Sequence, residues 1–243
     1  MQLILLCAGK GSRLPKLERN QPKCLIKINS KKLILYNYTF IKKFQHKIII
    51  TGYKNKILKL NTKNLETEYI YNKNYRNTNM VYSLYLARKK VTDDIVIMYG
   101  DIVFDSKIFN LLKPKKNIMP INKNWLINWK SRMGMSKTLL DAEDIKIIKN
   151  KVINIGSKIN KSHLPKYQYM GLIKLKKKVY INMMEYFEKL KNKKIDMTTF
   201  INLTIQKKIL KLNAVKTGMY WFEVDNKRDL KFAAKKLKKI NYI

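Results

Sequence analysis

Residues 6–25 read LCAGKGSRLPKLERNQPKCL, and this stretch decides the fold. An apolar run ends in two glycines that one residue separates, Arg13 follows two positions later, and Lys23 comes ten residues after Arg13. A glycine-rich turn after the first strand of an α/β sheet lets backbone N–H groups face an anion. The stretch therefore predicts an α/β fold whose first strand leads into a phosphate-binding loop.

Two common phosphate-binding loops are excluded by the spacing. Both the dinucleotide fingerprint GxGxxG and the P-loop GxxxxGK[ST], started at Gly9, require glycine where Leu14 stands. What remains is G-x-G-S-R followed by P-K. The planar fork of Arg13 suits a phosphate, and Lys23, placed after Pro22, suits the charge on a leaving pyrophosphate.

Short apolar strands alternate with amphipathic helices along the rest of the chain. This order predicts a Rossmann-like α/β fold, a mostly parallel mixed sheet with helices on both faces, in one nucleotide-binding domain over residues 1–243. The expected strands are 2–7, 47–51, 95–99 and 170–175, and the expected helices are 33–44, 80–90 and a terminal one at 226–240.

The formal charge of +37 raises the possibility of a nucleic-acid partner. Only six of the 53 basic residues are arginine, and lysines are scattered from one end to the other. Dedicated nucleic-acid binders concentrate their basic residues and include arginine. We therefore expect a solvated basic surface and no nucleic acid, with a basic nucleic-acid or membrane-binding module as the less favoured alternative.

The chain also gives an expectation for its compartment. No apolar run approaches the roughly 20 residues that cross a bilayer, and the apolar start QLILLCAG is too short for a signal peptide. Cys7 and Cys24 lack metal-ligand spacing, so we expect reduced thiols. A cytoplasmic protein without a transmembrane segment is predicted.

Two carboxylates follow predicted strands. Asp101 comes after Gly100 at the end of strand 95–99, and Asp225 ends the segment WFEVD. In α/β sheets, ligands bind outside the carboxyl ends of the strands. Two such carboxylates beside a triphosphate loop predict one Mg²⁺ whose octahedron water and phosphate oxygens complete.

These segments resemble a known family. LCAGKGSRL…PKCL, YGD and WFEVDNKRDL are similar to the signature of the sugar-1-phosphate nucleotidylyltransferases, and more closely to their phosphocholine cytidylyltransferase-like branch. NKNYRNTNMVYSLYLA looks like that branch's N-x-x-Y-x-x-x-N-x-x-S-L element. The resemblance spans nearly the whole chain and implies a nucleotidyltransferase.

The resemblance also implies roles for single residues. Lys23 and Arg13 would be catalytic, with Lys23 stabilising charge on the α- and β-phosphates, and Asp101 with Asp225 would bind Mg²⁺. Lys158 would meet the phosphate of the acceptor. The residues implied to hold the nucleoside triphosphate are Gly9, Gly11, Ser12, Arg13 and Lys23, and those implied to contact the acceptor lie near Asn79 and Ser83.

Four further residues are candidates for the acceptor pocket. Trp125 and Trp129 precede Asp141 and Glu143, and aromatic faces with carboxylates suit a cationic amine. An alternative is that the tryptophans only cover a helix or loop.

The expected activity is thus Mg²⁺-dependent transfer of CMP from CTP to a small phosphorylated or phosphonate metabolite, phosphocholine-like and amine-bearing, with release of pyrophosphate. A phosphate acceptor has a second pKa near ~6 and is already anionic, so no general base is needed. The two histidines, His46 and His163, are expected on the surface. The alternative is a sugar-1-phosphate nucleotidylyltransferase that uses UTP or dTTP.

Overall fold

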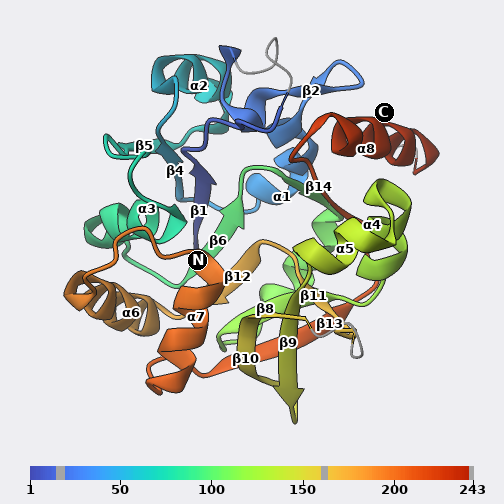
Figure 1. Ribbon diagram of the computed structural model, residues 1–243. Coiled ribbons are helices and arrows are strands. Elements are labelled where there is room, and N and C mark those ends of the chain that lie inside the picture. Colours follow the sequence, from blue (N-terminus) through green and yellow to red (C-terminus); the bar gives the residue numbers. More distant parts are fainter. Residues whose placement is uncertain (15–19, 160–163, 241–243) are drawn as a thin grey trace.

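The computed structural model describes residues 1–14, 20–159 and 164–240, and its centre is a mixed β-sheet with helices on both faces (Figure 1). His163 lies outside the described residues. Strands β5, β4, β1 and β6 run parallel, β12 is antiparallel to β6, and β8 and β13 run parallel beyond it. The predicted fold class is confirmed. In sheet order the strands are β5 (Glu68–Tyr71), β4 (Lys47–Thr51), β1 (Gln2–Cys7), β6 (Ile95–Tyr99), β12 (Leu172–Leu175), β8 (Ile118–Asn122), β13 (Leu212–Thr217), β10 (Lys151–Lys158) and β9 (Glu143–Ile148), and β11 (Gln168–Tyr169) pairs with β8.

Strands β1, β4 and β6 begin and end where the sequence predicts. Successive strand residues point to opposite faces, so a strand buried on both faces is a continuous apolar run. In β1, Ile4 joins the apolar cluster on one face of the sheet, whereas Leu3 and Leu5 join the cluster on the other. The first strand thus anchors both halves of the core.

Helices α3, α6 and α7 pack on one face, and α1, α2 and α4 on the other. No helix of the described part is long and apolar enough to cross a membrane. The helices are α1 (Tyr38–Ile41), α2 (Asn55–Thr62), α3 (Met80–Ala87), α4 (Trp125–Met133), α5 (Met135–Asp141), α6 (Lys177–Lys189), α7 (Met197–Gln206) and α8 (Lys227–Lys239), and short 3₁₀ helices cover Lys23–Leu25, Leu33–Asn37, Lys63–Leu65, Arg88–Lys90 and Ser106–Leu112.

Two small sheets lie beside the main one: β14 (Trp221–Glu223) pairs with β7 (Ile102–Phe104), and β2 (Lys27–Ile28) pairs with β3 (Lys31–Lys32). The terminal helix α8 begins after Asn226, which forms a reciprocal capping box with Asp229. The predicted terminal helix is therefore present, and it follows β14 directly.

Three predicted elements differ in extent. The helix expected over 80–90 is α3 followed by the 3₁₀ helix Arg88–Lys90. The helix expected over 33–44 is a 3₁₀ helix followed by the single turn α1, because the buried Asn37 side chain donates to Ile102 O and accepts from Phe104 N. The strand expected over 170–175 begins later, because Gly171 at φ +72° separates β11 from β12. A Cβ atom there would lie 2.8 Å from the Tyr99 ring.

Candidate active site

The carboxyl ends of β1 and β6 meet at the glycine loop. Gly100 follows β6, and its backbone N–H donates to Leu6 O at 3.1 Å. A Cβ atom at position 100 would lie 2.9 Å from that oxygen and 2.7 Å from Cys7 Sγ, so only glycine permits the approach. This contact brings Asp101 beside the loop that follows β1.

The loop itself needs one of its two glycines for packing. Gly11 has φ +66°, and the backbone N–H of Leu14 donates to Gly11 O at 3.0 Å. A Cβ atom at Gly11 would lie 2.7 Å from Leu14 Cδ1 and 3.3 Å from Lys23 Cβ. At Gly9 an added Cβ atom meets nothing within 4 Å, so the space beside this residue is open to a ligand.

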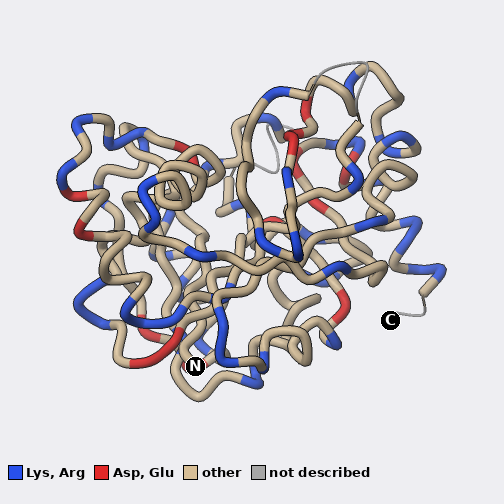
Figure 2. Tube along the Cα trace, turned by 90° about the horizontal axis from the view of Figure 1, so that it is seen from below, with Lys and Arg blue, Asp and Glu red and all other residues tan. Residues whose placement is uncertain are grey.

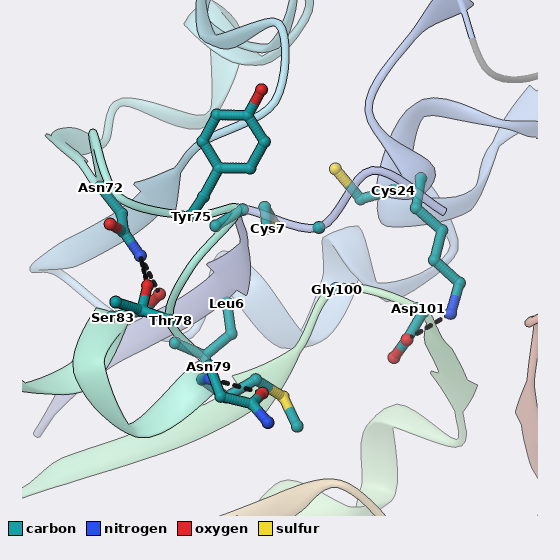
Figure 3. A pocket seen from close by; sticks show the side chains of 14 residues that line it. Leu6, Cys7, Cys24, Asn72, Tyr75, Thr78, Asn79, Ser83, Gly100 and Asp101 are labelled. Carbon is teal, nitrogen blue, oxygen red and sulfur yellow. Dashed lines mark hydrogen bonds and ion pairs between the residues drawn. The ribbon is translucent and has the colours of Figure 1, made fainter. Parts of the chain in front are cut away.

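Four of the predicted residues form one ion cluster. Lys23 Nζ donates to Asp101 Oδ2 at 2.6 Å and also to Asp225 Oδ1, and Arg13 Nη2 lies 3.0 Å from Asp225 Oδ2. Figure 3 marks the contact of Asp101 with a dashed line. The Arg13 side chain is 66% exposed, and Ser12 beside it is also exposed, so both remain accessible to a ligand.

The cluster fixes the charge of its members. Burial opposes charge on Lys23, but Asp101 and Asp225 outweigh it and raise the pKa of this lysine above its ordinary value. Burial would raise the pKa of Asp225, yet Lys23, Arg13 and Arg132 hold it below its ordinary value. Lys23 is therefore a permanent cation and Asp225 a permanent anion near neutral pH.

The two carboxylates also fit a divalent cation. Both accept from the same ammonium nitrogen, so their oxygens converge on one point that a positive charge already occupies. Within the described ranges, no further His, Cys, Asp or Glu completes a metal-binding group with them. Two carboxylates with phosphate oxygens and water form the usual Mg²⁺ environment in phosphoryl-transfer sites. The residues fit the predicted ion.

One cavity, here called the loop cavity, lies between the glycine loop and the start of α3 (Figure 3). Gly9, Lys23, Gly100 and Asp101 line it together with Asn79 and Ser83 from the α3 end. Asn79 and Ser83, expected near the acceptor, therefore lie in the same cavity as the residues expected to hold the nucleotide.

Asn72 is a lining residue of the loop cavity that sequence reasoning missed. Its side-chain nitrogen donates to Thr78 Oγ1 and Ser83 Oγ, each at 3.1 Å, and its oxygen accepts from Asn74 N at 2.9 Å. Asn72 directly follows β5, a strand that was not predicted from the sequence, so no predicted strand end marked this residue. The network fixes a row of polar groups along the cavity wall.

A second cavity, here called the acidic cavity, lies on the other side of the ion cluster. Its lining includes five of the 16 acidic residues of the chain, and no lysine or arginine is among its described lining residues. Asp141 and Glu143 were singled out in the sequence, whereas Asp196 and Glu223 were not. The five acidic residues are Asp141, Glu143, Asp196, Glu223 and Asp225.

Burial and the neighbouring carboxylates raise the pKa of two of these five groups, Glu223 and Glu143. Burial, only partly offset by Arg132, raises the pKa of Glu223 to about 8. Burial also raises the pKa of Glu143, opposed by the hydrogen bond that Thr198 Oγ1 donates at 2.9 Å and assisted by Asp196. A ligand that brings positive charge relieves this repulsion, so the cavity suits a cation.

Of the remaining predicted residues, one lines this cavity, one lies in the core and one lies on the surface. Trp129 lines the acidic cavity, whereas Trp125 is 1% exposed and its indole N–H donates to Pro165 O at 3.1 Å. Trp125 therefore packs in the core and lines neither cavity, so its contact with substrate stays a prediction. Lys158 is exposed and pairs in register with Glu143, which places both side chains on one face of the β9–β10 ribbon.

The ion cluster lies where the two cavities meet. Lys23 and Asp101 line the loop cavity, Asp225 lines the acidic cavity, and Met80 lines both. Two ligands bound in the two cavities would thus meet at a point surrounded by Lys23 and the carboxylates. This arrangement can join a group held on one side to a nucleophile held on the other.

The large positive charge is not gathered at either cavity. Figure 2 shows Lys and Arg distributed around the trace rather than on one face. His46 is exposed. An acidic cavity in a chain of net charge +37 is therefore a local departure from the rest of the molecule.

Comparisons with known proteins identify the family of the chain. A family model described as "Nucleotidyl transferase" matches residues 2–240. The chain is 31% identical over 257 residues to the CTP:phosphoglutamine cytidylyltransferase of Campylobacter jejuni subsp. jejuni serotype O:2, with 97% of this chain and 100% of the relative covered.

Two solved structures share the fold. The inositol-1-phosphate CTP transferase from T. maritima has a TM-score of 0.78 at 16% identity, with 98% of this chain and 96% of the other covered. The CTP:phosphocholine cytidylyltransferase from Streptococcus pneumoniae has a TM-score of 0.75 at 19% identity, with 97% and 98% covered.

Proposed function

The chain belongs to the nucleotidyl transferase family, and from this premise we propose that it transfers CMP from CTP to a small, amine-bearing phosphate or phosphonate, releasing pyrophosphate. The observation that carries the proposal is the junction of the loop cavity and the acidic cavity at Lys23, Asp101 and Asp225. A nucleotide on one side and a cationic acceptor on the other bring their reacting groups to this junction.

The reaction requires in-line positioning and charge neutralisation. An oxygen of the acceptor phosphate attacks the α-phosphorus of CTP, and the bond to the β-phosphate oxygen breaks as pyrophosphate leaves. Lys23 supplies a permanent positive charge to the departing pyrophosphate, and the exposed fork of Arg13 binds phosphate oxygens. Backbone N–H groups of Gly9, Gly11 and Ser12 cradle the same chain of phosphates.

Asp101 and Asp225 would hold Mg²⁺, which supplies charge neutralisation and orientation to the triphosphate when bound. The same two carboxylates pair with Lys23. In the reaction they keep Lys23 and the triphosphate at the junction of the two cavities.

The acidic cavity supports an acceptor that carries an amine. Glu143 and Asp196 line this cavity, and their carboxylates stabilise a cation; Trp129 lines it beside them, with its ring already faced by Arg132. Lys158, opposite Glu143 in the ribbon, supplies a counter-charge for the acceptor phosphate. CTP as the donor rests on the CTP-dependent relative and on the cytidylyltransferase-like sequence element that contributes Asn79 and Ser83 to the loop cavity.

A substrate panel tests the proposal. Pyrophosphate release is measured for ATP, GTP, CTP, UTP and dTTP, each with phosphocholine, aminoethylphosphonate, phosphorylated amino-acid analogues and glucose 1-phosphate. We expect the highest kcat/KM for CTP with an amine-bearing acceptor. Greater turnover with UTP or dTTP and glucose 1-phosphate would replace the proposal with a sugar-1-phosphate nucleotidylyltransferase.

Glu143→Gln should raise the KM for the amine-bearing acceptor by about tenfold, because it removes one negative charge next to the cation at nearly constant volume. The KM for CTP should stay unchanged. With the uncharged carbon isostere of phosphocholine, wild type and variant should have the same KM. Asp144→Asn is the matched control, since Asp144 is the next residue of β9 and does not line the cavity. If the two substitutions changed the KM for the acceptor equally, the result would contradict a role for Glu143 in binding the acceptor.

A further inference from the structure

Arg132 on α4 lies behind the acidic cavity and contacts the chain on both sides of Asp225. Its side chain is only 4% exposed. Nη1 donates to Glu223 O at 3.4 Å, and Nε lies 3.5 Å from Asp229 Oδ1. Because Glu223 ends β14 and Asp229 lies in the first turn of α8, one guanidinium joins the two elements between which Asp225 is placed.

Asp229 connects this guanidinium to Asp225. The Asp229 side chain is 1% exposed, and its Oδ2 accepts from the backbone N–H groups of Asp225 at 2.8 Å and Asn226 at 3.1 Å. Its other oxygen faces Arg132. Asp229 Oδ1 and Arg132 Nε form an ion pair without a hydrogen bond. The backbone of Asp225 is therefore held by a carboxylate that faces the charge of Arg132, while the Asp225 side chain points to Lys23 and Arg13.

Arg132 is itself held in place. Its guanidinium lies 4.9 Å from the Trp129 ring centre, and Nη2 lies 3.7 Å from Asp141 Oδ2. A planar fork can face an aromatic ring and several oxygens at once, which the point charge of lysine cannot do. Both Trp129 and Asp141 line the acidic cavity, so the same side chain supports that wall.

We propose that Arg132 is a positioning residue of the reaction, which fixes Asp225 at the junction of the two cavities through Asp229 and the Glu223 carbonyl. The inference rests on the proposed function, in which Asp225 holds the cation beside the triphosphate. It adds a residue that contacts neither ligand. Arg132 links the wall of the acidic cavity to a carboxylate of the reaction centre.

Arg132→Lys tests the role because it keeps the charge and removes the fork. We expect kcat to fall by about tenfold to a hundredfold, as for small displacements of reacting groups, with the KM for CTP unchanged. Titration of Mn²⁺ in the presence of CTP, followed by electron paramagnetic resonance, should show weaker binding of the ion. In the Asp225→Asn background, measured with labelled CTP, Arg132→Lys should change the residual rate by less than about twofold.

Lys174→Met is the matched control for a buried cation. Lys174 on β12 is 2% exposed, and its Nζ donates to Pro114 O at 2.8 Å; its register partner on β6 is Val96, toward the strand end away from the cluster. The control should lower the melting temperature but leave kcat and Mn²⁺ binding unchanged.

Asp229→Asn is a second test, because it keeps an oxygen for the Asp225 N–H and removes the charge that faces Arg132. It should weaken Mn²⁺ binding in the same direction as Arg132→Lys. The proposal is overturned if Arg132→Lys lowers only the melting temperature, or if its effect multiplies fully with that of Asp225→Asn. Full activity of Asp225→Asn alone would instead overturn the proposed cation site and, with it, this role.

Discussion

Lys23→Ala is expected to lower kcat by roughly 10²-fold or more. The alanine removes a permanent positive charge from the junction of the two cavities, where negative charge grows on pyrophosphate as it leaves. Since this interaction strengthens toward the transition state, the loss should appear in kcat more than in the KM for CTP. Steady-state kinetics with saturating acceptor separates the two parameters.

The control for Lys23→Ala is Lys27→Ala, which removes an exposed lysine of the adjacent β2 strand and should leave kcat unchanged. A variant at position 23 that raises only the KM for CTP would make Lys23 a binding residue. Thermal melting of both variants shows whether a folding defect contributes to the loss.

Asp101→Asn and Asp225→Asn should each lower activity by about 10²-fold or more with little change in melting temperature. Each substitution removes one of the two charges that converge on the cation position and nearly preserves side-chain volume. Excess chelator should abolish wild-type activity, and Mg²⁺ or Mn²⁺ should restore it. Equilibrium dialysis with Mn²⁺ and CTP should show weaker binding of the ion in both variants.

Asp105→Asn is the matched control for these two changes. Asp105 lies close in sequence to Asp101 and accepts from Lys107 N as a helix cap, a role that asparagine also fulfils. Its activity should equal that of the wild type. Full turnover by Asp101→Asn or Asp225→Asn, or by the wild type in chelator, would contradict a shared cation site.

The strands of the parallel half of the sheet could be predicted from the sequence because side chains on both faces of each strand are buried. The runs that form β1, β4 and β6 are apolar without interruption, so local composition alone marks their ends. The segment after Leu33 was harder, since its helical spacing is interrupted by the side chain of Asn37, which bonds to β7 far along the chain. No local pattern reports such a contact.

The residues of the ion cluster could also be predicted from the sequence, because each has a local signal. Asp101 follows a strand and Lys23 belongs to a recognisable loop, so each carries its own signal even though only the fold brings them together. Asn79 and Ser83 were identified as site residues, but the cavity that they line depends on how α3 meets the glycine loop.

The acidic cavity could be predicted only in part. Glu143 begins β9, Asp196 caps α7 and Glu223 ends β14, and nothing in the sequence shows that these three positions face one cavity. Trp125 and Trp129 are four residues apart on α4, yet only Trp129 reaches the cavity. The burial of Trp125 depends on its contact with Pro165, which is distant in sequence.

The most direct test of the account follows the α-phosphorus of CTP. The enzyme is incubated with CTP labelled at that phosphorus and an amine-bearing phosphate acceptor. The products are then separated, identified and quantified by mass spectrometry. The account predicts that the label and the acceptor appear in one diphosphate-linked product, in equal amount to the pyrophosphate released. Release of inorganic phosphate, or of pyrophosphate with the label in free CMP and no joined product, would contradict it.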